Sequence, residues 1–309
     1  MNPRLLVLST GLLLALGAAP AYAETATYKL SGGVATKKMR YYAPSQRVVL
    51  RGRVKPAVPG EVLTLHAVRG KRATKKVRRR VRGGGRFTFR FKVGNPGVVR
   101  LVVKHRASPA QPAFRARSKR IRVVDWQAGT GQRGLKVLLL QRALLGEGFA
   151  TPVTGYYDAA TARGVLAFRK TNGMGRDGYA TKEVYAKLLR GEGAFKLRYP
   201  RAGKHVEFDW SRQVLVLARG RKPYRTYHTS SGTPSTPTVF GSYRFYLQTP
   251  GTNSKGMVHS SYFIGGYAIH GYASVPNYPA SHGCLRVPIP NARSIFRWID
   301  IGDRIFTYR

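Results

Sequence analysis

The residues best suited to covalent chemistry lie near the C-terminal end of the chain. The only cysteine among the 309 residues stands in the run Ser281-His282-Gly283-Cys284-Leu285-Arg286. A thiol attacks as its thiolate, so it needs a base or a positive neighbour to react near neutral pH. The upstream pair His270-Gly271 supplies an imidazole. His282 is a second imidazole within reach in the sequence. These residue types are suited to nucleophilic chemistry at Cys284, with either histidine as the base.

The residues beside Cys284 fit the same chemistry. Gly283 allows a tight backbone turn, whose N–H groups can face the oxyanion that develops in acyl transfer. Arg286 shares a strand face with Cys284 if the segment is extended, where it can lower the pKa of the thiol or hold a substrate carboxylate. Two alternatives stay open. A lone cysteine is more often a small buried apolar residue, and His282 fits a structural role as well as a catalytic one.

The composition limits other chemistries. A single cysteine cannot form an intramolecular disulfide. We find no convincing cluster of metal-ligating residues, so we expect neither a metal nor another cofactor. The remaining histidines have no partner motif and are interpreted as surface or core residues: His66, His105, His205, His228 and His259.

The elements that must position Cys284 and His270 form a strand-rich region, residues 205–309. Its hydrophobic patterning predicts strands at 213–218, 224–230, 242–247, 262–269 and 304–308. One helix is expected at 290–299, where four apolar residues share a face: Ala292, Ile295, Phe296 and Ile299. We therefore interpret residues 205–309 as a β-rich catalytic domain.

The arrangement of these motifs resembles the L,D-transpeptidase catalytic domain, also called the YkuD-type domain. That family carries His-Gly, a spacer, and then Ser or Thr, any residue, Gly and Cys, which here are His270-Gly271 and Ser281-His282-Gly283-Cys284. Three further landmarks match the family: Thr236-Pro237-Thr238 with Gly241, Gly265-Gly266-Tyr267-Ala268, and Gly302-Asp303-Arg304-Ile305. The spacer before Ser281 is short for the family, which affects the loop that covers the site.

The resemblance implies a two-step acyl transfer without a metal. Cys284 attacks the bond between the third residue of a peptidoglycan stem peptide and its terminal D-Ala, with His270 as base and the carbonyl of Gly271 orienting the imidazole. D-Ala leaves and a thioester remains. The side-chain amine of a second stem then resolves the thioester into a 3–3 cross-link. If water attacks instead, the enzyme is an L,D-carboxypeptidase.

The resemblance also assigns the residues around the thiol. His282 and Gly283 are implied to build the oxyanion hole with Cys284, and Ser281 to support it. Arg286 is implied to contact a carboxylate of the stem peptide. Two tyrosines are implied to line the acyl-donor site: Tyr262 and Tyr267.

Residues 128–191 have helical patterning. Leucines recur at helical spacing in the first candidate helix, and Asp158 and Thr181 are placed to cap two more. The landmarks resemble the three-helix peptidoglycan-binding domain, in the order Leu140-Gln141, Gly155, Asp158, Thr161, Phe168 and Asp177-Gly178. Arg169 stands where that family usually has Gln. The domain is either a wall-binding module or a plain spacer, and residues 192–204 are expected to link it to the catalytic domain.

Residues 27–124 predict a third domain, a β-sandwich of immunoglobulin-like type. Phe87, Phe89 and Phe91 alternate with polar residues, which is the period of a half-buried strand. Turn residues such as those at 59–60, 83–85 and 95–97 separate several such strands. The densely basic run at 71–82 is either a solvated hairpin or an anion-binding surface, and both interpretations stay open.

The N-terminus predicts export. Met1 to Arg4 form a short basic region, an apolar stretch follows, and Ala21-Tyr22-Ala23 resembles a cleavage site. We therefore expect residues 1–23 to be a signal peptide and the mature protein to be secreted to the cell wall or periplasm. The apolar stretch is too short to span a bilayer comfortably and no second one follows, so no stable transmembrane anchor is expected.

The charge predicts anionic partners. The chain has 55 Lys and Arg against 12 Asp and Glu, a formal net charge of +43, which attracts polyanions. With export, this favours a role in cell-wall biogenesis and cell shape, with peptidoglycan stem peptides and glycan, and anionic wall polymers, as partners. A nucleic-acid binder is the rival that the signal peptide and the lack of a recognisable module argue against. A non-catalytic wall-binding protein is the other alternative.

Overall fold

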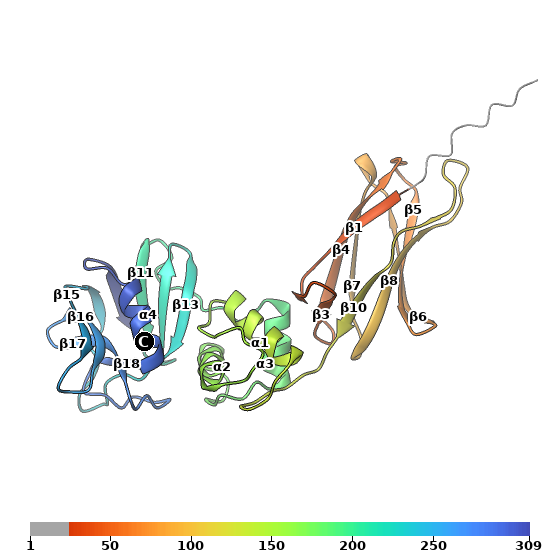
Figure 1. Cartoon of the computed structure of the whole chain (residues 1–309). Coiled ribbons are helices and arrows are strands. Elements are labelled where there is room, and N and C mark those ends of the chain that lie inside the picture. The colour runs from red at the N-terminus through yellow and green to blue at the C-terminus, as the bar shows by residue number, and fades with distance from the viewer. Residues whose placement is uncertain (1–24) are drawn as a thin grey trace, which may run out of the picture.

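The computed structural model describes residues 25–309. The predicted signal peptide, residues 1–23, lies outside the described residues. Figure 1 shows three parts in chain order: a two-sheet domain, three helices, and a second two-sheet domain that ends the chain. Within residues 25–309, no helix is both long enough and apolar enough to cross a membrane.

The C-terminal domain contains a five-stranded sheet, a four-stranded sheet and one helix. The five-stranded sheet has the order β13 (Lys222–His228), β12 (Val214–Arg219), β11 (Lys204–Asp209), β19 (Arg304–Tyr308) and β14 (Gly241–Arg244). The four-stranded sheet has the order β15 (Leu247–Thr252), β16 (Val258–Ile264), β17 (Tyr267–Tyr272) and β18 (Leu285–Pro288). Helix α4 spans Ile289–Trp298.

The core of this domain joins the two sheets and α4 in one cluster. Leu217 of the first sheet, Ile269 of the second and Ile295 of α4 are all almost fully buried in it. Each such side chain contributes about 1.5–3 kcal/mol by leaving water. The cluster therefore fixes β17 and β18, the two strands next to the catalytic motifs.

The predicted strand at 262–269 is wrong, because the chain turns back at Gly265-Gly266. That turn separates β16 from β17, which pair antiparallel, and Gly265 has a φ of +46° that favours glycine. The predicted strand at 242–247 is also divided, between β14 and β15, where Phe245 enters the core. The other predicted strands of this domain and its helix lie within two residues of the observed ones.

The three helices form a separate small core. They are α1 (Leu135–Gly146), α2 (Ala159–Thr171) and α3 (Lys182–Arg190). Both predicted caps are confirmed: the Asp158 side chain accepts from Thr161 N, and the Thr181 side chain accepts from Val184 N.

Arg169, the departure from the family pattern, ties α2 to the loop before α3. Its Nε donates to Gly175 O at 2.6 Å, and its Nη1 donates to Tyr179 O at 2.9 Å. Its Nη2 lies 2.7 Å from Asp177 Oδ2. A branched guanidinium holds three acceptors at once, which a Gln amide cannot do. Arg169 is therefore a structural residue of the helical domain.

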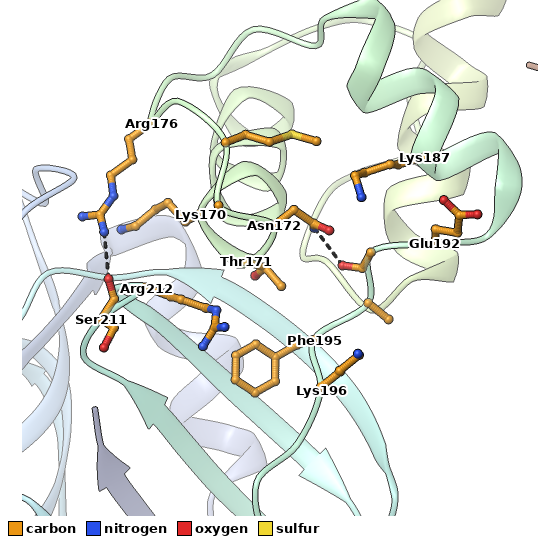
Figure 2. Close-up of a pocket in the computed structure, with 14 residues that line it drawn as sticks. Lys170, Thr171, Asn172, Arg176, Lys187, Glu192, Phe195, Lys196, Ser211 and Arg212 are labelled. Carbon is orange, nitrogen blue, oxygen red and sulfur yellow. Dashed lines mark hydrogen bonds between the residues drawn. The ribbon is translucent and has the colours of Figure 1, made fainter.

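The expected linker at 192–204 contains no helix or strand before Lys204, where β11 begins, and it is packed against the catalytic domain. Phe195 is 5% exposed and clusters with Val214 and Val216 of β12. Figure 2 shows its ring against the strands of the catalytic domain. The amides of Arg198 and Tyr199 donate to the buried carboxylate of Glu207. The segment therefore attaches to the sheet instead of running free between the domains.

The N-terminal domain contains two further sheets. One has the order β1 (Thr25–Ser31), β4 (Arg47–Lys55) and β7 (Arg86–Lys92). The other has the order β2 (Val34–Ala35), β3 (Arg40–Tyr42), β10 (Lys119–Val123), β8 (Gly97–His105), β5 (Val62–Arg69) and β6 (Arg72–Arg80), with β9 (Phe114–Arg115) pairing with β8. The basic run at 71–82 thus contains an edge strand, β6, which forms a hairpin with β5.

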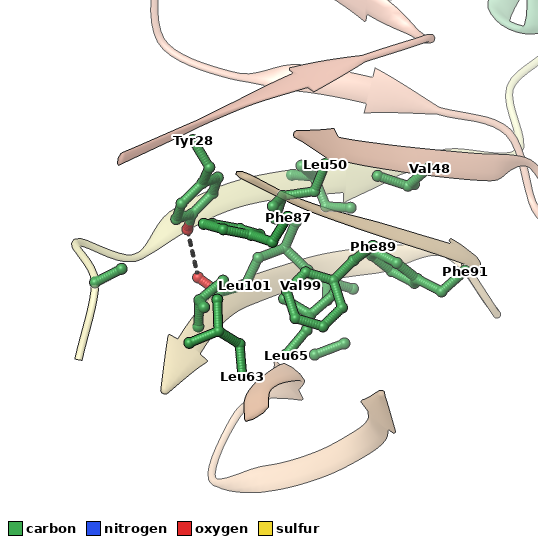
Figure 3. Close-up of a cluster of buried hydrophobic side chains, with 14 of the residues drawn as sticks. Tyr28, Val48, Leu50, Leu63, Leu65, Phe87, Phe89, Phe91, Val99 and Leu101 are labelled. Atoms are coloured by element: carbon green, nitrogen blue, oxygen red, sulfur yellow. Dashed lines mark hydrogen bonds between the residues drawn. The ribbon is translucent and has the colours of Figure 1, made fainter. Parts of the chain in front are cut away.

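The two N-terminal sheets pack through alternating side chains. Figure 3 shows Phe87, Phe89 and Phe91 of one sheet facing Leu65 and Leu101 of the other. The predicted alternation of β7 is therefore confirmed. The immunoglobulin-like type of the sandwich stays a prediction.

Candidate active site

The two motifs meet because β17 and β18 pair as parallel neighbours. The register places Ile269 opposite Leu285 and His270 opposite Arg286. Residues directly opposite in a sheet point to the same side, and side chains alternate along each strand. His270, Arg286 and, one position before β18, Cys284 therefore share one sheet face.

A side chain closes the turn that presents the thiol. Ser281 Oγ donates to Cys284 O at 2.6 Å and accepts from Gly283 N at 3.1 Å. Ser281 is 2% exposed, so this small ring of bonds is sheltered from water. The N–H of Gly283 is thereby used within the turn.

Gly283 is required by two features of the turn. Its φ is +114°, a conformation that side chains rarely adopt. A Cβ added there would lie 2.4 Å from Cε1 of Tyr267. The ring of Tyr267 thus lies directly against the turn that carries Cys284.

Two threonines hold the Cys284 turn from the other side. Thr238 Oγ1 donates to Gly283 O at 2.6 Å and accepts from Gly232 N at 3.0 Å. Thr236 Oγ1 donates to Ser281 O at 3.0 Å. Both threonines belong to the family landmark, but their supporting role was not predicted from the sequence. Their hydroxyls were the available signal, because buried threonines seek hydrogen-bond partners.

His270 is held in one tautomer. It is 3% exposed, and its Nδ1 lies 3.0 Å from Gly271 O. A carbonyl only accepts, so Nδ1 carries the proton and Nε2 is left as the basic nitrogen. Gly271 itself lets α4 approach, since a Cβ there would lie 2.7 Å from Cβ of Ala292. The structure therefore explains both residues of the His270-Gly271 pair: one supplies the basic nitrogen, and the other gives the space that α4 needs.

The electrostatics favour a neutral pair before the reaction. Burial lowers the pKa of His270, and the charge of Arg286 lowers it further, although the Gly271 carbonyl opposes the shift. Burial raises the pKa of Cys284, against the opposing effects of the Ala268 amide, Arg286 and Lys255. Both shifts disfavour a preformed thiolate–imidazolium pair. The arrangement is suited to proton transfer during attack.

The other residues named from the sequence lie around this pair. Arg286 is half-buried, donates from Nη1 to Ala280 O at 3.0 Å, and places its guanidinium 4.1 Å from the ring centre of Tyr272. Tyr262 lies opposite Ala268 in the β16–β17 pair. The His282 side chain is exposed. The part of the chain that the structure describes holds no group of three or more His, Cys, Asp or Glu that could bind a metal.

Comparisons with known proteins match two parts of the chain to families. Residues 203–306 match the family model of the L,D-transpeptidase catalytic domain, YkuD, and residues 133–188 match that of a peptidoglycan binding domain. A solved L,D-transpeptidase (residues 123–326) from Xylanimonas cellulosilytica is 32% identical with a TM-score of 0.54, covering 60% of this chain and 98% of that chain. An L,D-transpeptidase from Stackebrandtia nassauensis is 18% identical with a TM-score of 0.38, covering 59% and 95%. Among curated proteins, none matches the chain.

Proposed function

Because the chain belongs to the L,D-transpeptidase family, we propose that it forms 3–3 cross-links in peptidoglycan through a thioester on Cys284. The observation that carries this proposal is the parallel pairing of β17 with β18, which puts His270 and the thiol on one sheet face. The family matches support a transpeptidase that acts on peptidoglycan.

In the first step, Nε2 of His270 takes the thiol proton as Sγ of Cys284 attacks the carbonyl carbon of the third stem residue. The tetrahedral intermediate then expels D-Ala, whose amine receives the proton from His270. A thioester and free D-Ala result. General base catalysis of this kind contributes about 10²–10⁴-fold in rate.

In the second step, the side-chain amine of another stem attacks the thioester. His270 accepts a proton from the amine and returns it to Sγ as the thiol leaves, so the enzyme is regenerated. Water in place of the amine would make the enzyme an L,D-carboxypeptidase, and both outcomes use the same acyl-enzyme. A protein that only binds the wall is the remaining alternative.

The proposed oxyanion hole uses backbone amides of the Cys284 turn. Since the N–H of Gly283 donates to Ser281 Oγ, the amides of His282 and Cys284 are the stronger candidates for the oxyanion. Ser281 and Gly283 then shape the turn. Arg286 is proposed to hold a stem carboxylate, and Tyr262 and Tyr267 to line the acyl-donor site.

The proposal extends to location and partners. We propose that residues 1–23 direct export, that residues 27–124, 128–191 and 205–309 are the three domains, and that the protein works in the cell wall or periplasm. The helical domain is proposed to bind peptidoglycan. Anionic wall polymers are proposed as further partners because of the net charge of +43.

Intact-protein mass spectrometry with a tetrapeptide stem tests the chemistry. The expected mass gain equals the stem acyl group without D-Ala, on the peptide that contains Cys284. Adding an acceptor stem separates cross-linking from hydrolysis by its products. An adduct that persists in the Cys284→Ala variant, or no adduct on the unaltered protein, would rule out the proposed thioester.

A further inference from the structure

The helical domain contacts the loop that joins the two catalytic motifs. This loop, residues 273–280, runs from the end of β17 to Ser281. The side of the loop that is turned away from the catalytic domain faces α2 and the segment that follows α2. Arg176 bonds the loop directly, whereas Lys170 reaches it through His228 of the catalytic domain.

Lys170 reaches the loop through a buried histidine. Lys170 is 3% exposed and His228 is 5% exposed. Lys170 Nζ lies 2.9 Å from His228 Nδ1 and donates to Thr229 O at 3.1 Å. His228 Nε2 lies 2.8 Å from Val275 O. A carbonyl only accepts, so Nε2 donates to Val275 and Nδ1 accepts from Lys170, which makes a continuous chain from α2 to the loop.

Arg176 makes a second attachment two residues further along the loop. Its Nη1 donates to Asn277 O at 2.9 Å, and Asn277 Nδ2 donates back to Arg176 O at 2.8 Å. Its Nη2 donates to Ser211 O at 2.8 Å, the bond drawn in Figure 2. Arg176 thus joins the loop and the β11–β12 turn to the helical domain.

The near side of the loop is fixed to the catalytic domain. Ser230 Oγ donates to Tyr278 O at 2.7 Å, and Ala280 N donates to Ser231 O at 2.8 Å. Although the Tyr278 backbone is bonded in this way, Tyr278 is 59% exposed. The loop is therefore held from both domains while it presents an aromatic ring to solvent next to the Cys284 turn.

We propose that Lys170 and Arg176 of the helical domain are positioning residues for the active-site loop 273–280. They act by holding Val275 and Asn277, so the loop keeps the shape that receives a stem peptide. The helical domain then has a second role besides wall binding. This inference rests on the proposed transpeptidase function.

Arg176→Ala in the full chain tests the inference. We expect kcat/KM for a tetrapeptide stem to fall about tenfold, since small misplacements of a binding element are costly. Alkylation of Cys284 by iodoacetamide should keep its rate and pH profile, because the Cys284–His270 pair is untouched. Hydrogen exchange should accelerate at residues 273–280, and Arg176→Lys should recover part of the loss.

Arg142→Ala is the matched control, because Arg142 is an exposed arginine on α1 of the same domain. Lys170→Met is the second test variant and removes the bonds from α2 to His228 and Thr229. The inference is overturned if both Arg176→Ala and Lys170→Met keep the kcat/KM of the unaltered protein and its exchange pattern at 273–280. An unaltered protein that forms no acyl-enzyme would instead refute the proposed function, while the exchange pattern would still decide the loop attachment.

A separate observation concerns the outer face of the seven-stranded sheet. The register places Lys104 opposite Thr64 and Thr64 opposite Arg78, and Arg100 directly opposite Arg120. Like charges directly opposite in a sheet are destabilising. We call the basic face the exposed outward residues Lys76, Arg78, Arg100, Lys104, Arg120 and Arg122.

The positive field of this face is not neutralised within the domain. Burial lowers the pKa of His66, and the charges of Lys104 and Lys76 lower it further. Glu61 is the only acidic residue among residues 25–124, and its carboxylate is bonded to His105 and Ser108. Within residues 25–309, no ion pair engages a residue of the basic face.

We infer that the basic face binds a linear wall polymer with repeating anionic groups. Neighbouring strands in a sheet lie about 4.8 Å apart, so the cations of β10 and β8 lie one strand apart, and those of β8 and β6 lie two strands apart on either side of β5. Strands β5, β6, β8 and β10 contain no Phe, Tyr or Trp, so the face lacks the rings on which nucleic-acid bases stack. A polymer without bases is therefore favoured.

Binding of the purified protein to poly(glycerol phosphate) and to poly-glutamate tests this inference and separates phosphate from carboxylate sources. The test variant replaces Lys76, Arg78, Arg100 and Lys104 by Gln. The matched control replaces Arg47, Arg51, Arg53 and Arg90, which are exposed on the opposite sheet, so both variants lose the same charge. We expect the test variant alone to lose about tenfold or more in affinity at 0.15 M salt.

Equal losses in the two variants would overturn the basic face as a site, because net charge alone would then explain binding. Tighter binding to single-stranded DNA than to both polymers would overturn the choice of partner. Neither result depends on transpeptidase activity.

Discussion

The N-terminal and C-terminal domains are both built from two packed sheets, but they use charge in opposite ways. Residues 25–124 contain 28 Lys and Arg and one acidic residue, whereas residues 205–309 contain 12 Lys and Arg and four acidic residues. All four of these acidic side chains are bonded within the fold: Glu207, Asp209, Asp300 and Asp303. The acidic side chains of the catalytic domain therefore stabilise its fold through hydrogen bonds and ion pairs, whereas most charged side chains of the N-terminal domain face solvent.

The comparison predicts that activity and wall retention can be lost separately, and His270→Asn should show this most strongly. Asn keeps polarity but cannot serve as the base, so acylation of Cys284 should slow by about 10²–10⁴-fold. Rapid-quench mass spectrometry measures that rate. Retention on purified sacculi should not change, and His66→Asn in the N-terminal domain is the control for acylation. A loss below tenfold would contradict the assigned base.

Removing an acidic side chain should cost more stability in the catalytic domain than in the N-terminal domain. Glu207 is 0% exposed and accepts from the amides of Arg198 and Tyr199 and from the hydroxyl of Tyr308. Glu207→Ala leaves these donors buried without an acceptor, so the free energy of unfolding should fall by about 3 kcal/mol or more. Urea unfolding measures it. Glu61→Ala should cost less, and equal losses would contradict the comparison.

Local patterns predicted most elements, because alternation and caps depend on neighbours in the sequence. The strand at 304–308 and the caps Asp158 and Thr181 are examples. The turn at Gly265-Gly266 does not follow from the hydrophobic pattern, because apolar residues flank it on both sides. Residue type alone does not separate a strand interrupted by glycine from a hairpin.

The candidate site was predictable as a motif but its supports were not. His270 and Cys284 could be named because the residues beside them match a family motif. His228 had no partner in its own segment, and its partner Lys170 lies 58 residues away in another domain. Such contacts depend on how the domains pack, which the hydrophobic pattern of either domain does not contain.

The junction between the helical and catalytic domains places the comparison in a third setting, a buried amine. Burial lowers the pKa of Lys170 to about 6, with a smaller contribution from Arg176. In the unfolded chain this amine titrates near its usual value of about 10.4. The folded state thus binds fewer protons between these values, so stability should fall as pH decreases from about 10 to about 6 and level off below.

The slope from this one group is at most about 1.4 kcal/mol per pH unit. Melting temperatures of the unaltered protein and of Lys170→Met, measured across that pH range, isolate it by difference. The groups facing this amine are His228 and Arg176. Because Lys170 is one of the charges that lower the pKa of His228, the comparison is read above about pH 7, where an ordinary histidine is neutral. A pH-independent difference would show that Lys170 stays charged in the folded protein.

The smallest predicted effect compares one threonine from each of the two sheet domains. Thr238 is 2% exposed and bonds both Gly232 N and Gly283 O, whereas Thr74 bonds only Ala67 O on an exposed hairpin. Thr238→Val keeps the shape but leaves both backbone groups without that partner. It should cost about 1–2 kcal/mol, whereas Thr74→Val should stay within about 0.5 kcal/mol.

The same pair of variants tests whether the hydroxyl of Thr238 serves the site or only the fold. If it holds the Cys284 turn, Thr238→Val should slow acylation by about tenfold at temperatures where the variant remains fully folded. Thr238→Ser, which restores the hydroxyl, should recover most of that rate. Recovery of stability without recovery of rate would mean that the turn depends on the threonine methyl group, and the bond to Gly283 O would then not be what positions the thiol.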